Sequence, residues 1–288
     1  MEFTGERFML GQHGNIKLEH LHRYLSAERL APGKDVLDIA CGEGYGSAIL
    51  ARSARKVFGV DISAEAVDHA RRHYVLDNLD FRPGSASAIP LPDKSIDLVV
   101  SFETIEHHDQ HDAMMAEIKR VLRPSGVLLI SSPDKRVYSE LPNYTNPYHV
   151  KELSRSEFFE LLQRYFSNIT GYGQRVIHGS AILADDIQTA TASFREQDDT
   201  TQGSAGLIDS MYLIALASDG PLTPIPSGVF EGPIEENESY AALNQALAAA
   251  NVAYATADKA RAAAEEAQVA VKEQLAAQRA ISAGLSAR

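Results

Sequence analysis

A glycine-rich turn after a short apolar segment has the residue types of a ligand-binding loop. Residues 36–40 read Val-Leu-Asp-Ile-Ala, and residues 41–46 read Cys-Gly-Glu-Gly-Tyr-Gly. Small residues at alternate positions let a ligand approach the backbone closely, and glycine also allows a positive φ. Such a turn between a strand and a helix is typical of sites for nucleotide-like ligands. The carboxylate of Asp38 before the glycines disfavours a pyrophosphate there and favours a cationic ligand.

A second carboxylate follows the next apolar segment. Residues 57–61 read Val-Phe-Gly-Val-Asp, and Asp61 lies 23 residues after Asp38. This spacing suits a carboxylate that accepts hydrogen bonds from ribose hydroxyls. Asp61 is therefore a candidate ribose ligand.

Asp38 and Asp61 can act on one ligand only if the strands that carry them end at the same edge of a sheet. The sequence pattern predicts such a sheet. Strand-like and helix-like segments alternate from residue 36 to residue 132, which indicates an α/β fold with a parallel sheet between helices. Strands are predicted at 36–40, 56–60, 79–82, 96–101, 127–132, 166–176 and 207–217, and helices at 16–30, 45–54, 63–74, 111–122 and 154–165. A polar, poorly patterned segment at 197–202 separates the last two strands, and the end of the sheet is expected to be antiparallel.

Taken together, the motifs resemble those of class I S-adenosylmethionine-dependent methyltransferases. The resemblance rests on the turn at 38–46, Asp61, the segment 89–101 and the Val-Leu-Arg-Pro-Ser-Gly run at 121–126, in the family's order over residues 33–217. It implies an enzyme with a Rossmann-like, seven-stranded, mostly parallel sheet. It also implies S-adenosyl-L-methionine as the cofactor.

The same resemblance assigns cofactor contacts. Residues of the glycine turn line the methionine end, the aspartate after the second strand takes the ribose, and the apolar residue after it packs on the adenine. The family often has an aspartate after the third strand, where Ser85 stands here, so adenine recognition is expected to use backbone atoms. The predicted cofactor contacts are Asp38, Ala40, Gly42, Gly44, Asp61, Ile62, Ser85, Ala86 and Ser101.

Methyl transfer to a hydroxyl requires positioning and a general base, most often histidine. His107 follows the fourth predicted strand, where loops at the carboxyl ends of strands face the ligand crevice. His149 lies in the insertion after the fifth strand, which is expected to overhang the same site. Either histidine is a candidate base, with Glu103 orienting it or the acceptor. A structural hydrogen bond for His107, or a packed loop position for His149, is the alternative.

Neighbouring groups are interpreted more simply. His108 and His111 are expected to open a helix at the surface. The His and Asp residues at 107–112 could also hold a divalent metal, but their spacing matches no tight metal motif, so no metal is predicted. Cys41 is expected to fill a small gap in the glycine turn.

The flanking segments indicate the acceptor. Residues 4–8, 19–24, 101–107 and 146–153 resemble methyltransferases that are encoded with, or fused to, bacterial glycosyltransferases. Such proteins methylate sugar hydroxyls of surface polysaccharides, and some relatives cap the growing O-antigen chain and carry a C-terminal coiled coil. The insertion supplies polar and aromatic side chains of the kind that bind neutral sugars: Tyr138, Asn143, Tyr144, Asn146 and Tyr148.

Composition limits the other functions. The net charge of −12 over 288 residues argues against a nucleic-acid partner. The single cysteine cannot form an internal disulfide, which fits a reducing compartment. No apolar window is long enough for a transmembrane segment, and the N-terminus lacks the apolar core of a signal peptide. A cytoplasmic location is expected, with any attachment to the inner membrane made through partners.

The last part of the chain differs in composition, since 20 of the final 48 residues are alanine. Apolar residues at alternating three- and four-residue spacing predict a weak coiled coil, and a solvated single helix is the alternative. The stripe comprises Leu243, Leu247, Ala250, Tyr254, Ala257, Ala264, Val271, Leu275 and Leu285. A coiled coil would join copies of the chain or recruit a glycosyltransferase partner.

The expected organisation is therefore uneven. It comprises an arm and helix covering the site at 1–32, a catalytic domain at 33–218, a Pro-rich linker at 219–236 and the Ala-rich helix at 237–288. Two other functions stay open at this point. One is a methyltransferase of a small lipid or natural product, whose lid would be more apolar. The other is a non-enzymatic coiled-coil scaffold with a vestigial cofactor fold.

Overall fold

The computed structural model describes residues 15–176, 192–197, 200–205, 207–230 and 238–286, and the chain divides into two compact units after residue 232. The elements of the first unit are α1 Asn15–Glu28, β1 Asp35–Ile39, α2 Tyr45–Ala51, β2 Lys56–Asp61, α3 Ala64–His73, β3 Leu79–Pro83, β4 Ile96–Ser101, η1 Ile105–His107, α4 His111–Val121, β5 Leu122–Pro133, η2 Arg136–Glu140, α5 Arg155–Gln163, β6 Asn168–Gln174, β7 Ala192–Gln197, β8 Thr200–Ala205 and β9 Tyr212–Ser218. The second unit contains α6, Glu238–Ser286.

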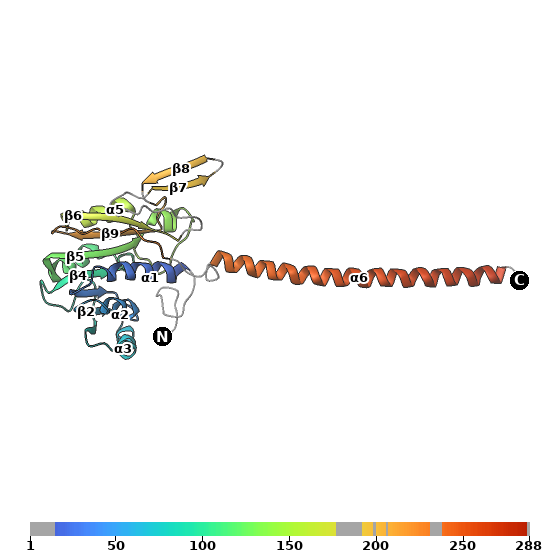
Figure 1. Cartoon of the computed structure of the whole chain (residues 1–288), viewed down its shortest axis with the longest axis horizontal. Coiled ribbons are helices and arrows are strands. Elements are labelled where there is room, and N and C mark those ends of the chain that lie inside the picture. The colour runs from blue at the N-terminus through green and yellow to red at the C-terminus, as the bar shows by residue number, and fades with distance from the viewer. Residues whose placement is uncertain (1–14, 177–191, 198–199, 206, 231–237, 287–288) are drawn as a thin grey trace. The chain divides into compact units, whose positions relative to one another are not determined.

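Seven strands of the first unit form one sheet in the order β3-β2-β1-β4-β5-β9-β6 (Figure 1). The first five in this order pair in parallel, and β9 runs antiparallel to both β5 and β6. This confirms the predicted mostly parallel, Rossmann-like sheet with an antiparallel end. The chain order reverses between β1 and β4, and ligands of open α/β sheets bind outside the carboxyl ends of strands at such a point.

The sheet forms because its central strands are apolar on both faces. Successive side chains of a strand point to opposite faces, so Leu37 packs in one core cluster while Val36 packs in another. The first cluster includes Met114 of α4 and Phe158 of α5. The second includes Tyr24 of α1, together with residues of α2. Helices therefore cover both faces and hold the strand ends in place.

Local signals set most element boundaries. Ser63 caps α3 through its Oγ, which accepts the N–H of Ala66, and Ser154 forms a reciprocal capping box with Glu157 at the start of α5. The largest differences from the predicted boundaries are at two strand starts: β5 begins five residues early, at Leu122, and β9 begins five residues late, at Tyr212. The polar segment around 197–202 contributes to an antiparallel hairpin, β7–β8, which its residue pattern did not predict.

Residues 219–230 form no helix or strand, yet part of this segment packs on the first unit. Leu222 and Ile225 contact the core, and the backbone N–H of Ile225 donates to Tyr172 Oη at 2.9 Å. In the second unit, α6 is a continuous helix of 49 residues with exposed large apolar side chains such as Leu243 and Tyr254. Among the described residues, no helix combines the length and apolar character needed to cross a bilayer.

Candidate functional site

The glycine turn after β1 packs closely against the protein at one glycine and borders open space at another. Ala40, Gly42 and Gly44 all have positive φ, at 58°, 56° and 94°. A Cβ added at Gly42 would meet nothing within 4 Å, so this part of the backbone borders free space. A Cβ at Gly44 would lie 2.7 Å from the ring of Phe81, so this glycine is required by packing. The open part of the turn is therefore centred on Gly42.

Asp61 joins the end of β2 to this turn. Its Oδ2 accepts the N–H of Gly42 at 2.9 Å, and its Oδ1 accepts the N–H of Ser63 at the same distance. The next side chain, Ile62, is 77% exposed although it is large and apolar. Ile62 offers an exposed apolar surface beside this carboxylate. These features fit the predicted ribose and adenine contacts.

Asp38 lies beneath the surface of the turn. It is fully buried, and its carboxylate accepts hydrogen bonds from Tyr24 Oη at 3.1 Å and Ser47 Oγ at 2.6 Å. Burial, with a smaller contribution from the charge of Asp61, raises its pKa to about 7 against the lowering effect of the two hydroxyl donors. Cys41 is buried in the same turn, as expected for a gap-filling residue, and burial raises the pKa of its thiol.

The remaining predicted cofactor residues follow β3 and β4. Ser85 Oγ accepts the N–H of Ser87 at 3.2 Å, which holds the turn that contains Ala86. Ser101 is the last residue of β4, and its Oγ is buried with no hydrogen-bond partner among the described residues. The structure thus gathers the residues after β1, β2, β3 and β4 at one edge of the sheet.

Glu103 sits in the loop after β4 with a positive φ of 48°. Its Oε1 accepts from Ser131 Oγ at 2.6 Å and lies 3.6 Å from Arg23 Nη1. The guanidinium of Arg23 is fully buried, donates to Gln174 at 3.0 Å and lies 4.7 Å from the ring centre of Tyr212. Arg23 was not predicted from the sequence, because only the fold brings α1 to this loop.

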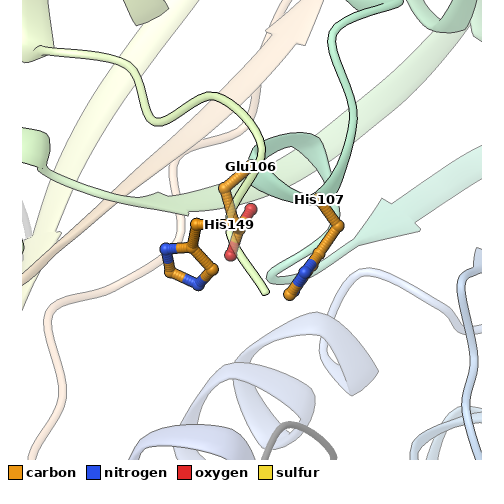
Figure 2. A group of neighbouring side chains, drawn as sticks. All are labelled: Glu106, His107 and His149. Carbon is orange, nitrogen blue, oxygen red and sulfur yellow. The ribbon is translucent and has the colours of Figure 1, made fainter. Parts of the chain in front are cut away.

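The two candidate bases come together at the carboxyl ends of β4 and β5. The backbone N–H groups of Val150 and Lys151 both donate to the carbonyl of Glu106, at 2.8 and 3.0 Å. This pairing places the ring of His149 5.2 Å from that of His107, with an interplanar angle of 86°. Figure 2 shows the Glu106 carboxylate between the two imidazoles.

Hydrogen bonds fix the orientation of both rings. His149 Nδ1 lies 2.5 Å from Glu152 Oε1, and His107 Nδ1 lies 3.2 Å from the carbonyl oxygen of Tyr148. Both partners accept hydrogen bonds, so each ring carries its proton on Nδ1, and Nε2 of His149 accepts from the side-chain amide of Asn146 at 3.1 Å. The ring of His149 also stacks on Tyr138, with centroids 5.2 Å apart.

Glu106 is a site residue that the sequence analysis missed. It is 1% exposed, and its Oε2 has no hydrogen-bond partner among the described residues. Burial raises the pKa of this carboxyl well above its usual range, with a further contribution from the charge of Glu103. Its position directly before His107 was the available signal.

The neighbouring histidines correct one expectation. His111 begins α4 as predicted, but it is buried rather than at the surface, and its Nε2 bonds the carbonyl of His108 at 2.8 Å. The reason is that the loop after β4 folds over the start of α4. Burial lowers the pKa of both histidines, and neither belongs to the group around His149.

Comparison with known sequences gives three findings. Residues 37–130 match a family described as a methyltransferase domain. A Mycolicibacterium smegmatis protein named "Probable S-adenosylmethionine-dependent methyltransferase" is 35% identical over 207 residues, covering 67% of this chain and 79% of that protein. A fatty-acid O-methyltransferase of the same species is 32% identical over 126 residues, covering 43% of this chain and 45% of that protein. The chain spans about half the length of several curated relatives that it matches.

Comparison of the fold gives the same architecture. The crystal structure of the YcgJ protein from Bacillus subtilis aligns with a TM-score of 0.52 at 17% identity. The alignment covers 70% of this chain and 100% of that one. The likeness therefore extends over the whole of the compared protein.

Proposed function

Because the chain belongs to the S-adenosylmethionine-dependent methyltransferases, we propose that it transfers the methyl group to a hydroxyl of a carbohydrate acceptor. The family makes it an enzyme with S-adenosyl-L-methionine as cofactor. When bound, the cofactor would supply an electrophilic methyl group on its sulfonium sulfur. The acceptor oxygen would take this methyl as the C–S bond broke, with that electron pair going to sulfur and the hydroxyl proton to a base.

The cofactor contacts in this proposal follow the turn and the strand ends. Gly42 would border the methionine part, since its backbone faces open space. Asp61 would accept bonds from the ribose hydroxyls while its backbone partners hold it still, and Ile62 would cover the adenine. Asp38 would act from beneath the turn, through its negative charge, on the cationic ligand.

The observation that carries the choice of a hydroxyl is the pair of oriented imidazoles. A carboxylic acid is already ionised at neutral pH and needs no base, whereas a sugar hydroxyl must lose its proton as the bond forms. His107 and His149 lie together at the carboxyl ends of β4 and β5, and each ring is oriented through Nδ1. Nε2 would be the atom that takes the proton, and the Asn146 amide would release it in His149. Glu152 would stabilise a positive charge on His149, and Glu103 would help to orient the acceptor.

The surroundings of the histidines support a neutral, hydroxylated acceptor. Tyr144 and Tyr148 are about half exposed, and Asn146 donates to Tyr138 Oη at 3.2 Å. Aromatic faces and hydroxyl or amide groups are suited to the ring and hydroxyls of a sugar. We therefore take the terminus of a bacterial surface polysaccharide, such as an O-antigen chain, as the proposed acceptor, and methylation there would end chain growth.

A lipid acceptor is the second candidate, because one relative is a fatty-acid O-methyltransferase. Rhamnose- and mannose-terminated oligosaccharides, long-chain fatty acids and small phenols can be incubated with the protein and labelled cofactor, then analysed by mass spectrometry. We expect a methyl ether on an oligosaccharide. If only the fatty acid or the phenol were methylated, the sugar acceptor would be rejected in favour of the second candidate. Failure to bind the cofactor in calorimetry would favour the scaffold function.

The long helix α6 would serve assembly in this proposal. Its apolar stripe is exposed at Leu243, Leu247, Tyr254, Val271 and Leu275. A helix of this length with such a stripe gains stability by packing against another helix. We propose a homo-oligomeric coiled coil, with a glycosyltransferase as the alternative partner.

A further inference from the structure

We propose that Glu106, His107 and His149 form a binding site for a divalent cation at the acceptor end of the site. This inference rests on the proposed function only for the cation's role, and the binding itself can be tested without an acceptor. Each of the three residues offers one ligand atom, and these atoms all lie within 4.8 Å of one another. Three ligands about 2.1 Å from one ion lie about 3–4 Å apart, so small side-chain rotations would close the site.

The buried carboxylate of Glu106 is the second and independent observation. Its Oε2 has no hydrogen-bond partner among the described residues although the side chain is almost completely buried. A buried polar atom without a partner is costly, and a buried charged one more so. In Figure 2 this carboxylate points into the space between the two imidazoles, where a cation would supply the missing partner.

The histidines are oriented as metal ligands usually are. A metal-binding imidazole typically donates its other N–H to a carboxylate or a backbone carbonyl, which fixes the ring and its tautomer. His149 uses Glu152 in this way, and His107 uses the carbonyl of Tyr148. Glu152 is itself held, because its Oε1 accepts from Ser139 Oγ at 2.8 Å.

One contact must be exchanged when a cation binds. Asn146 Nδ2 lies 3.1 Å from His149 Nε2, the atom that would face the ion. The amide keeps a partner after the exchange, because Nδ2 also donates to Tyr138 Oη. The backbone bonds from Val150 and Lys151 to Glu106 hold the two ligand-bearing loops together in either state.

The donor set indicates the class of ion. Two imidazole nitrogens and one carboxylate oxygen suit Mn²⁺, Co²⁺ or Zn²⁺ better than Ca²⁺, which prefers six to eight oxygens. Three protein ligands leave coordination positions open, as in catalytic rather than structural sites. With their ring nitrogens bound to an ion, the two histidines would not take the hydroxyl proton themselves. The ion would instead lower the pKa of an acceptor hydroxyl that it contacts, so that the proton could leave to water, and would fix the direction of that hydroxyl toward the methyl group.

The test is a titration of metal-stripped, untagged, full-length protein with Mn²⁺. The electron paramagnetic resonance signal of the free ion measures how much Mn²⁺ remains unbound. We expect saturable binding near one equivalent. Glu106→Gln, His107→Ala and His149→Ala should each weaken it at least tenfold. His73→Ala is the control, because it removes a ring of another close histidine pair, His69–His73 on α3, and should leave the binding unchanged.

Cofactor calorimetry and thermal unfolding on each variant distinguish a lost ligand from a lost fold. The proposal is overturned if the wild type shows no saturable binding of Mn²⁺, Co²⁺ or Zn²⁺. It is also overturned if the three variants keep cofactor affinity and bind metal as the wild type does. Metal binding without methylation of any oligosaccharide would remove the proposed acceptor and leave the metal site. Undiminished oligosaccharide methylation by metal-free protein would overturn the cation's role in catalysis.

Discussion

The backbone N–H of Gly42 donates to Asp61 Oδ2 at 2.9 Å, so the glycine turn after β1 and the end of β2 are held as one unit. The other carboxylate oxygen of Asp61 accepts from Ser63, the N-cap of α3. A single side chain thus fixes the spacing between the methionine and ribose parts of the expected cofactor site.

Replacing Asp61 with alanine should therefore weaken cofactor binding. The change removes both the proposed ribose acceptor and the link to the turn, and we expect the dissociation constant to rise about 10- to 100-fold, or about 1.4–2.7 kcal/mol. Isothermal titration calorimetry measures this directly. Asp68→Ala, at an exposed position on α3, is the matched control. Equal affinity for the Asp61 variant and wild type would remove the ribose assignment.

Asp38 should make folding stability depend on pH. Its pKa rises from 3.8 to about 7 on folding, so between these values the folded chain holds a proton that the unfolded chain has lost. Stability contributed by this group is present below pH 3.8, falls by a few kcal/mol toward pH 7, and is level above. Urea unfolding at pH 5 and pH 8 should show a smaller decrease for Asp38→Asn than for wild type. The same decrease in both would contradict the raised pKa.

Glu152 should act as a positioning residue for His149. Loss of the carboxylate frees Nδ1 and the ring orientation, so Glu152→Ala should lower kcat about 10- to 100-fold with a smaller change in KM. Glu152→Asp should recover part of the loss, and the pH profile of kcat should shift in the alanine variant. Glu160→Ala, on α5 and exposed, is the control. A fall in thermal stability without these kinetic changes would indicate a structural role only.

The apolar stripe of α6 should control self-association. Placing charges at Leu243 and Leu247 should convert an oligomer to a monomer, because two apolar contacts of the proposed coiled coil are lost. Multi-angle light scattering on the full chain measures the state. Ala241→Asp with Ala248→Asp adds the same charge off the stripe and should have no effect. A wild-type monomer at micromolar concentration would leave α6 as a single solvated helix.

Much of the fold could be predicted because its signals are local. Alternating apolar segments and capping residues such as Ser63 and Ser154 define elements within a few residues. The hairpin β7–β8 escaped prediction because its strands, Ala-Ser-Phe-Arg-Glu-Gln and Thr-Thr-Gln-Gly-Ser-Ala, lack the apolar alternation that marks a half-buried strand.

Site residues could be predicted from the sequence only where they lie together in one short motif. The glycine turn and Asp61 belong to such segments. The group of Glu106 and His149 depends on backbone pairing between residues more than 40 positions apart, and the burial of Arg23 depends on where α1 docks. No periodicity or spacing along the chain indicates these long-range contacts. The two histidines were therefore predicted individually, and the Glu106 carboxylate between them was missed.

Backbone hydrogen bonds hold both ends of the segment between β5 and α5. Asp134 pairs with Leu153, the N–H of Lys135 bonds the carbonyl of Leu153, and Glu106 receives the N–H groups of residues 150 and 151. The intervening stretch at 140–148 carries two half-exposed aromatic side chains, Tyr144 and Tyr148, and the backbone N–H of Asn143 within it bonds a residue of the same stretch. Acceptor preference could therefore diverge between relatives, or be exchanged by loop grafting, while the reactive side chains keep their places.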